Sequence, residues 1–320
     1  MKKPLILAVA AMALTAGAQA ESKFYGKMNV SVGYDDASEA LKLNSNASRL
    51  GVKGSSDLGT SKVIYQAEFE LAADDGYATN SANVTTYADS NTDTVTVVDT
   101  DSNTLKPRDT YVGLAYEGLG TVKMGIMDTP LKKSQGKFDL FNDVFDIKGV
   151  LDGEKRLGNS VNYTTEKIGN VQASVAVVMM EDGSDDGISA NVIYKAGDIY
   201  ASVAMDNKTE DADTSTIRAT AIYTMGDLRL GALVNNVDAS DTNDAELGFA
   251  VNASMKMGKN TAKVQFASAD QSSLGETSLS LGVDHKLAKS TKAFAYVNLE
   301  DADAADSDKT TMQFGLVHKF

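Results

Sequence analysis

The sequence contains no cysteine and no tryptophan, and it has only three prolines and two histidines among its 320 residues. The absence of cysteine excludes a disulfide framework and thiol chemistry. After the first twenty residues there is no apolar run of about 18 residues, which excludes a transmembrane helix. The net charge of −14 argues against binding to the phosphates of nucleic acids. The mean hydropathy of −0.21 does not exclude a transmembrane β-barrel, because only alternate residues of such a barrel meet lipid.

The N-terminus has the pattern of a secretory signal peptide. Two lysines near the start precede an apolar stretch over residues 5–16, and the small residues Ala18 and Ala20 form a cleavage site. We therefore expect residues 1–20 to be removed after Ala20, leaving one exported domain over residues 21–320. Loss of the two lysines takes the net charge from −14 to −16.

Apolar and polar residues alternate in many segments of the remaining chain, which predicts strands with one apolar and one polar face. The final segment, residues 312–320, keeps this alternation to the last residue, although chain termini usually fray. A closed barrel in a membrane requires such an ending, because its last strand must pair with its first to leave no edge in lipid. The alternative is an amphipathic edge strand of a soluble sandwich.

Short turns punctuate the alternating segments at regular intervals. Glycines at 169, 197, 226 and 258 mark four turns that lie 28, 29 and 32 residues apart. Two strands of about ten residues with one turn and one longer loop give such a spacing. We predict an all-β fold, a transmembrane antiparallel β-barrel of about 16 strands that encloses a water-filled channel.

The connection over residues 128–155 differs from the other loops. Its segment 138–147 contains three phenylalanines among carboxylates, and an exposed loop has no need of so many aromatic residues. We expect this loop to fold into the lumen, with its aromatic rings on the inner wall and its carboxylates toward the pore. A short amphipathic helix on the outer rim is the alternative, since long ordered loops are often functional in other ways.

Basic residues occupy the polar face of several predicted strands. Lys27, Arg49 and Arg156 alternate with apolar neighbours along the chain, so their side chains should point to the polar face of the strand. Arg108 is less clear, because it precedes a segment that alternates poorly. A basic wall that faces an acidic loop would create a strong transverse field across a narrow aqueous gap. The alternative for each of these residues is a charge that extends to the rim of the barrel.

Six segments carry a family resemblance: residues 24–27, 48–54, 108–114, 119–125, 156–163 and 315–320. In order and spacing they resemble the Gram-negative general diffusion porins, which are trimeric 16-stranded outer-membrane channels. The resemblance covers the whole predicted mature chain. It implies a lumen constriction with a basic wall and an acidic loop, and an assembly signal at the C-terminus. The residues concerned are Lys27, Arg49, Arg108 and Arg156 on the wall, Asp139, Asp143 and Asp146 on the loop, and Phe314, Leu316, His318 and Phe320 in the assembly signal.

The resemblance also implies partners and a location. We expect a homotrimer in the outer membrane of a Gram-negative bacterium, with the long connection over residues 72–107 as a candidate latch onto a neighbouring subunit. Outer-membrane lipid, lipopolysaccharide and the barrel-assembly machinery, which binds the C-terminal strand, are further expected partners. We expect no cofactor and no bound nucleic acid.

The expected function is passive diffusion of small hydrophilic solutes and ions. Ile126 stands where many relatives carry a basic residue, so the basic wall is thinner here. Together with the net charge of −16, this departure predicts a preference for cations.

Three other functions remain as alternatives. A membrane-embedded enzyme needs a base, and the two histidines, His285 and His318, have no identifiable nucleophile partner. An adhesin or phage receptor could hold Ca²⁺ in acidic loops such as residues 181–186, although their spacing matches no strong calcium motif. A substrate-selective porin would need a path of aromatic side chains, which are few in the predicted loop.

Overall fold

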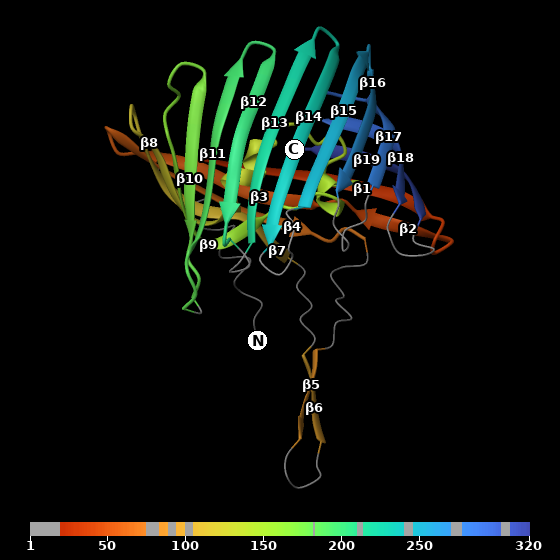
Figure 1. Ribbon diagram of the computed structural model, residues 1–320, viewed down its shortest axis with the longest axis horizontal. Helices are drawn as coiled ribbons and strands as arrows, with labels where there is room; N and C mark the ends of the chain where they lie inside the picture. The colour runs from red at the N-terminus through yellow and green to blue at the C-terminus, as the bar shows by residue number, and fades with distance from the viewer. Residues whose placement is uncertain are drawn as a thin grey trace.

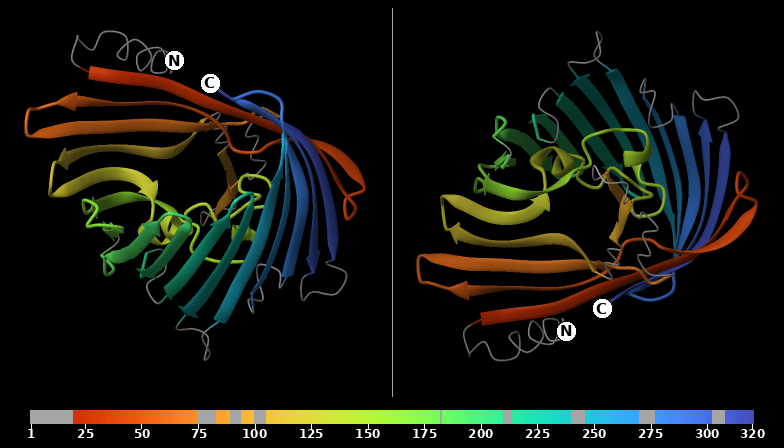
Figure 2. Two further views of the ribbon diagram at one scale, coloured as in Figure 1. Left: turned by 90° about the horizontal axis from the view of Figure 1, so that it is seen from above. Right: turned by 90° about the horizontal axis from the view of Figure 1, so that it is seen from below.

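The strands form one closed antiparallel barrel in the computed structural model (Figures 1 and 2). The structure describes residues 20–74, 83–88, 94–99, 105–181, 183–209, 214–239, 246–269, 277–301 and 308–320. Strands β2 and β3 both pair with β1 and together form the second strand, so the barrel has the sixteen strands that the sequence predicts. The barrel strands are β1 (Ala20–Asp35), β2 (Ala40–Ser45), β3 (Ser48–Asp57), β4 (Ser61–Leu71), β7 (Leu105–Tyr116), β8 (Gly120–Asp128), β9 (Arg156–Thr164), β10 (Val171–Val178), β11 (Gly187–Ala196), β12 (Ile199–Asn207), β13 (Thr214–Met225), β14 (Leu228–Ala239), β15 (Glu246–Met257), β16 (Asn260–Ala269), β17 (Thr277–Lys286), β18 (Thr291–Asp301) and β19 (Lys309–Lys319).

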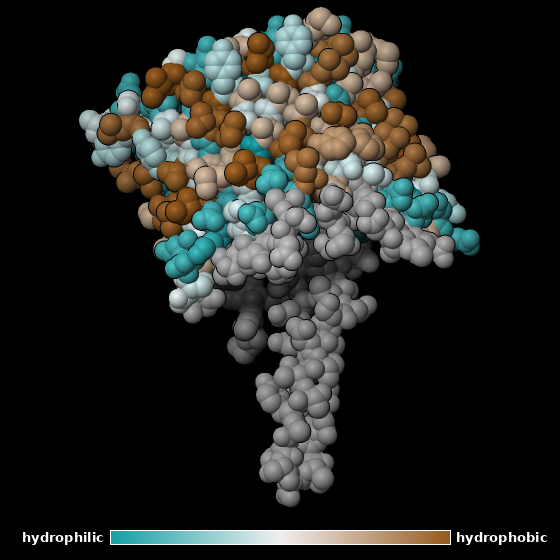
Figure 3. Space-filling view, in the orientation of Figure 1, coloured by the Kyte–Doolittle hydropathy of each residue, from teal (hydrophilic) through white to brown (hydrophobic). Residues whose placement is uncertain are grey.

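The alternating sequence pattern separates the two faces of the wall. Large apolar side chains such as Val203 and Ile217 point outward and are 59% and 57% exposed, and Figure 3 shows apolar residues gathered over the outer surface. Polar side chains of the same strands, such as Arg218, point inward and are buried. This inside-out arrangement suits a barrel surrounded by lipid. No helix among the described residues is long and apolar enough to cross a bilayer.

Short turns connect the strands at one end of the barrel. The four turn glycines predicted from the sequence have the positive φ angles that such tight turns require, between 53° and 63°. Longer connections lie at the opposite end, where the β5–β6 hairpin (Asn83–Ala88 and Thr94–Asp99) extends away from the barrel (Figure 1). In outer-membrane barrels the short turns are periplasmic and the longer loops extracellular, and we use these names for the two ends.

The first and last strands close the barrel. β1 and β19 pair over nine residues, from Lys27 with Lys319 to Asp35 with Thr311. Phe320 extends this seam, because its backbone N–H donates to the Gly26 carbonyl at 3.1 Å and its carbonyl accepts from the Gly26 N–H at 3.0 Å. The phenylalanine ring covers the α-carbon of Gly26 so closely that a Cβ there would lie 2.2 Å from a ring carbon. The ring therefore occupies space that only glycine leaves open.

Several expectations fall wholly or partly outside the described residues. Residues 1–19 are not described, so the signal peptide stays a prediction. The expected latch over residues 72–107 includes β5 and β6, which form a separate two-stranded sheet where the sequence suggested only a polar connection. Residues 75–82, 89–93 and 100–104 of that connection are not described.

Candidate functional site

The connection between β8 and β9 folds back into the lumen, as the sequence predicts (Figure 2). It begins with the short helix α2 (Pro130–Ser134), whose N-cap Thr129 accepts a hydrogen bond from the Lys132 N–H. The helix lies on the inner wall, where Leu131 N–H donates to Ser189 Oγ at 3.1 Å and Tyr200 donates to the Ser134 carbonyl at 2.8 Å. Strands β11 and β12 therefore hold the start of the loop.

Apolar side chains fix the middle of the loop against the wall. Phe138 and Phe141 are buried among side chains of β13 to β19. Glycines provide the space: a Cβ at Gly231 would lie 2.9 Å from the Phe138 ring, and one at Gly282 would lie 3.0 Å from the Phe141 ring. Phe145 packs, half-buried, beside Phe141. The predicted packing of all three phenylalanines on the inner wall is confirmed.

A buried ion pair holds the returning end of the loop. Arg218 of β13 is fully buried and pairs with Glu154 of the loop, which is also buried. The same guanidinium donates to the Asp152 carbonyl at 2.6 Å and to Asn235 Oδ1 at 3.2 Å. These contacts satisfy charges that would otherwise be costly to bury.

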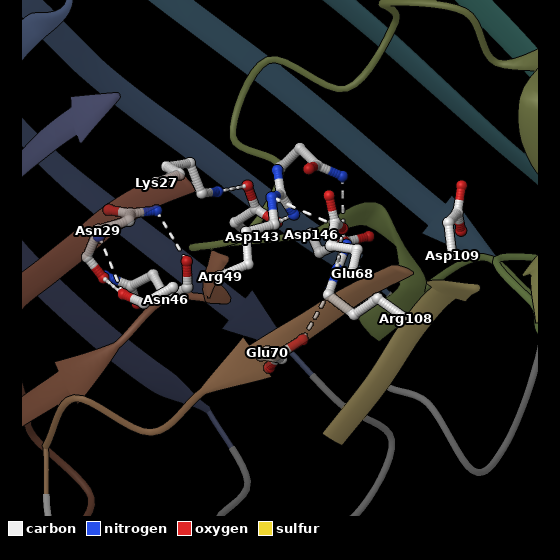
Figure 4. Close-up of polar contacts among 12 residues, drawn as sticks. Lys27, Asn29, Asn46, Arg49, Glu68, Glu70, Arg108, Asp109, Asp143 and Asp146 are labelled. Carbon is white, nitrogen blue, oxygen red and sulfur yellow. Dashed lines mark hydrogen bonds and ion pairs between the residues drawn. The ribbon is translucent and has the colours of Figure 1, made fainter. Parts of the chain in front are cut away.

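Asp143 reaches across the lumen to the opposite wall (Figure 4). Its carboxylate accepts a hydrogen bond from the ammonium group of Lys27 on β1. The guanidinium of Arg49 on β3 lies 3.6 Å from the other carboxylate oxygen. The loop and the wall thus meet through charged groups, which narrows the lumen at this level.

The predicted basic wall is paired with carboxylates. Arg108 donates to Glu68 at 2.8 Å and to Glu70 at 2.6 Å, both on β4. Arg156 lies 2.7 Å from Asp109 and 2.7 Å from Asp128. The four wall cations lie on the lumen side as predicted, but at this level the wall is close to charge-balanced.

Only one of the three predicted loop carboxylates contacts the wall cations. Asp139 accepts hydrogen bonds from the N–H groups of Phe141 and Ile147 and from Gln265 Nε2, at 2.9, 3.1 and 3.0 Å, so it organises the loop. Burial raises the pKa of Asp139. Asp146 caps the 3₁₀ helix η1 (Ile147–Gly149) by accepting from the Lys148 N–H. All three carboxylates nevertheless line the lumen cavity.

The acidic partners on the wall were missed from the sequence. Glu68 and Glu70 share parity with Gln66 and are opposite to Ala67 and Phe69, so the alternation rule could have placed them in the lumen. Asp109 could not be placed in this way. The pairing of β4 with β7 shifts between Ala67 and Phe69, so that two residues, Arg108 and Asp109, face the single residue Glu68. This β-bulge turns consecutive residues toward the same side.

The open part of the lumen is a cavity of about 2280 Å³. It is bordered by the loop and by charged and polar side chains from both walls, which makes it an aqueous space. The four wall cations and the three loop carboxylates lie at or beside this space. The arrangement is that of an aqueous channel with a constriction lined by charged side chains.

Comparison with known proteins agrees with this geometry. A family model described as Gram-negative porin matches residues 7–320. The chain belongs to the Gram-negative porin family. This family and the closed barrel are those of a non-enzymatic diffusion channel, and they indicate the outer membrane. Among curated proteins, no sequence matches this porin.

Solved porin structures share the fold of this porin at low sequence identity. An anion-selective porin from Comamonas acidovorans is 20% identical, with a TM-score of 0.76 and coverage of 94% of this chain and 100% of that chain. OmpF of Salmonella typhi, solved with daunomycin, is 13% identical, with a TM-score of 0.72 and coverage of 93% and 97%. The trimer form of OmpT from Vibrio cholerae is 15% identical, with a TM-score of 0.68 and coverage of 95% and 100%.

Proposed function

We propose that this porin lets small hydrophilic solutes and ions diffuse passively through the lumen, past the gap between the inserted loop and the wall. The observation that carries the proposal is the polar cavity of about 2280 Å³, bounded by a loop that is fixed at its start, middle and end. A fixed loop gives a filter of constant size, and charged side chains around it bias the passage of ions.

Swelling of liposomes that contain the purified protein tests this proposal. Neutral sugars should enter at rates that fall steeply as the size of the sugar approaches that of the gap. A folded, heat-modifiable protein that gives no swelling with any sugar would overturn the proposal, and would favour the surface-receptor alternative. Swelling with one sugar and none with others of equal size would favour a substrate-selective porin.

In this proposal, the charged side chains that border the lumen decide whether the channel prefers cations or anions. The net charge of −16 of the predicted mature chain, together with Ile126, predicted a preference for cations. Sixteen lysine and arginine residues but only ten aspartate and glutamate residues border the lumen cavity, so the acidic excess of the chain lies elsewhere. Ions in transit are affected most by the charges nearest to them. We therefore assign a weak anion preference, and the selectivity named for the Comamonas porin supports it.

We also propose that the porin is exported and assembles as a homotrimer. The trimer form of OmpT, which has the same fold, supports the trimer. Gel electrophoresis without heating should give a band of three subunits, and N-terminal sequencing of that band should begin at Glu21. A monomeric band, or a chain that keeps residues 1–20, would contradict these assignments. From its membership of the porin family, we also expect this porin to contact lipopolysaccharide, and to contact the assembly machinery through its C-terminal strand.

A further inference from the structure

Four cationic side chains border the periplasmic end of the lumen. Lys195, Arg229, Lys256 and Lys319 are the last inward-facing residues, or nearly the last, of β11, β14, β15 and β19. Their parity matches that of buried lumen residues on the same strands, and all four border the large cavity. We call this group the basic outlet.

The basic outlet lacks the pairing seen at the constriction. Among the described residues, none of its four members forms an ion pair within 4.0 Å, and Arg229 donates instead to the backbone carbonyl of Lys137 on the loop. Two carboxylates, Asp198 and Asp227, border the same end of the cavity from the turns, so four cations face two acids. The lysines of the outlet are exposed to the lumen.

Two strand cations nearer the extracellular end, Arg108 and Lys309, have close carboxylate partners, whereas Lys106 borders the cavity there without an ion pair among the described residues. Arg108 pairs with Glu70 at 2.6 Å, and Lys309 lies 3.8 Å from Glu300. At the periplasmic end itself, Lys263 and Lys292 border the cavity from β16 and β18 and share Asp284 at 2.8 and 2.9 Å, so they are not part of the unpaired group. Of the five described strand cations that border the cavity without an ion pair, four therefore lie at the periplasmic end.

We propose that the basic outlet is a low-affinity binding zone for small multiply charged anions, such as tricarboxylates and polyphosphates. This inference rests on the proposed function of the lumen as an open channel. Mutual repulsion of like charges in a narrow aqueous space is relieved when a multivalent anion binds between them. Flexible lysine side chains from several strands adapt to anions of different shape, so charge rather than geometry selects the ligand. Because the zone lies on one side of the constriction, it makes the channel asymmetric.

Single-channel recording in a planar bilayer tests the proposal. Citrate, and in a second series pyrophosphate, is added first to one chamber and then to the other while the KCl current is measured. Block from the periplasmic side should need about fivefold less anion than block from the extracellular side. An anion that enters from the periplasmic side meets several unpaired cations before it meets the constriction. Equal block by citrate and pyrophosphate at matched charge would show that the zone reads charge alone, whereas a preference for one would identify carboxylate or phosphate as its ligand.

Two triple variants localise the effect. Lys195→Gln, Lys256→Gln and Lys319→Gln together should abolish the difference between the two sides. The matched control neutralises Lys167, Lys259 and Lys289, which are exposed in the turns at the same end and do not border the cavity. If the outlet variant assembles poorly, the single variants Lys195→Gln and Lys256→Gln should each reduce the difference in part.

Two outcomes would overturn the proposal. Block that is equal from both sides of the unmodified channel would show that no asymmetric anion zone exists. Asymmetric block that persists in the outlet variant, or that disappears in the control variant, would place the zone elsewhere. Both outcomes require an open channel, so they differ from failure of the proposed function, in which no current flows.

Discussion

Among the described residues, Asp143 is the loop carboxylate that pairs with cations of the opposite wall. One oxygen of its carboxylate accepts a hydrogen bond from Lys27, and the other lies 3.6 Å from the guanidinium of Arg49. It adopts a positive φ of 73°, a backbone conformation that aspartate and asparagine tolerate better than most residues. The charge of this residue can therefore be removed without a change in backbone.

Asp143→Asn should shift the reversal potential in a KCl gradient toward anions, because Lys27 loses its carboxylate partner and Arg49 keeps only Glu68, at 3.9 Å. In an aqueous gap the change is on the order of 1 kcal/mol, which corresponds to a few-fold change in the permeability ratio. Asp185→Asn is the matched control, since the Asp185 side chain is 80% exposed and does not border the lumen. An unchanged reversal potential in Asp143→Asn would show that the loop charge does not act on permeating ions.

The residues of the site differ in how far they could be predicted. Strand parity was enough for Lys27, Arg49 and Arg156, since a side chain at a given parity faces a given side. The loop carboxylates could not be sorted in this way, because a loop has no fixed periodicity. Only the folded loop shows that Asp139 and Asp146 accept local N–H groups and that Asp143 does not.

The inserted loop is the element that gives the barrel its filter. It is held by hydrogen bonds at its helix, by phenylalanines in spaces left by glycines, and by the buried pair of Arg218 with Glu154. The excess of aromatic residues in the loop predicted that it lies inside the barrel. The glycines of the inner wall gave no such prediction, because a glycine in a strand has several explanations until its neighbour across the lumen is known.

Gly231→Ala should loosen the middle of the loop. The new Cβ would lie 2.6 Å from Asn252 Oδ1 and 2.9 Å from the Phe138 ring, and overpacking of this kind costs about 1–3 kcal/mol. We expect normal assembly, a lower thermal unfolding midpoint and a noisier single-channel current. Gly158→Ala is the control, since its nearest contact is 3.8 Å away, and equal noise in the two variants would contradict a wall-fixed loop.

Arg218→Met should destabilise the barrel by about 3–5 kcal/mol, because it leaves the buried carboxylate of Glu154 without its charged partner and with only the hydrogen bond from Gln135. The double variant Arg218→Met with Glu154→Leu removes both charges and should recover much of this loss. The measurement is the unfolding midpoint in detergent, followed by circular dichroism. A double variant less stable than the single variant would mean that the pair itself, rather than charge compensation, stabilises the loop.

The whole molecule depends on closure of the sheet. Sixteen strands leave no free edge only when β19 pairs with β1, and Phe320 is placed beyond the last paired residue, over Gly26. The fold class and the strand number followed from alternation and turn spacing, because both properties are local and repeat along the chain. The distribution of charged residues between the lumen and the loops could not be predicted from the composition, because composition does not say which charges face the lumen.

Deletion of Phe320 should reduce the amount of folded trimer in the outer membrane. The deletion removes two backbone hydrogen bonds of the seam and the ring contact with Gly26, where the assembly signal is expected to be read. The check is the fraction of heat-modifiable protein in outer-membrane preparations, compared with Phe314→Leu, which keeps an apolar residue at an outward position. Wild-type trimer levels after the deletion would remove the C-terminal residue from the assembly signal.

We propose that the charges around the lumen, rather than the net charge of the chain, determine which ions this porin lets pass. The reversal potential of the purified porin in a planar bilayer under a KCl gradient is the measurement that tests this proposal. We expect ohmic current steps with a potential that favours chloride over potassium. Open channels with a potential that favours potassium would contradict it, and folded protein without any current would contradict the channel itself.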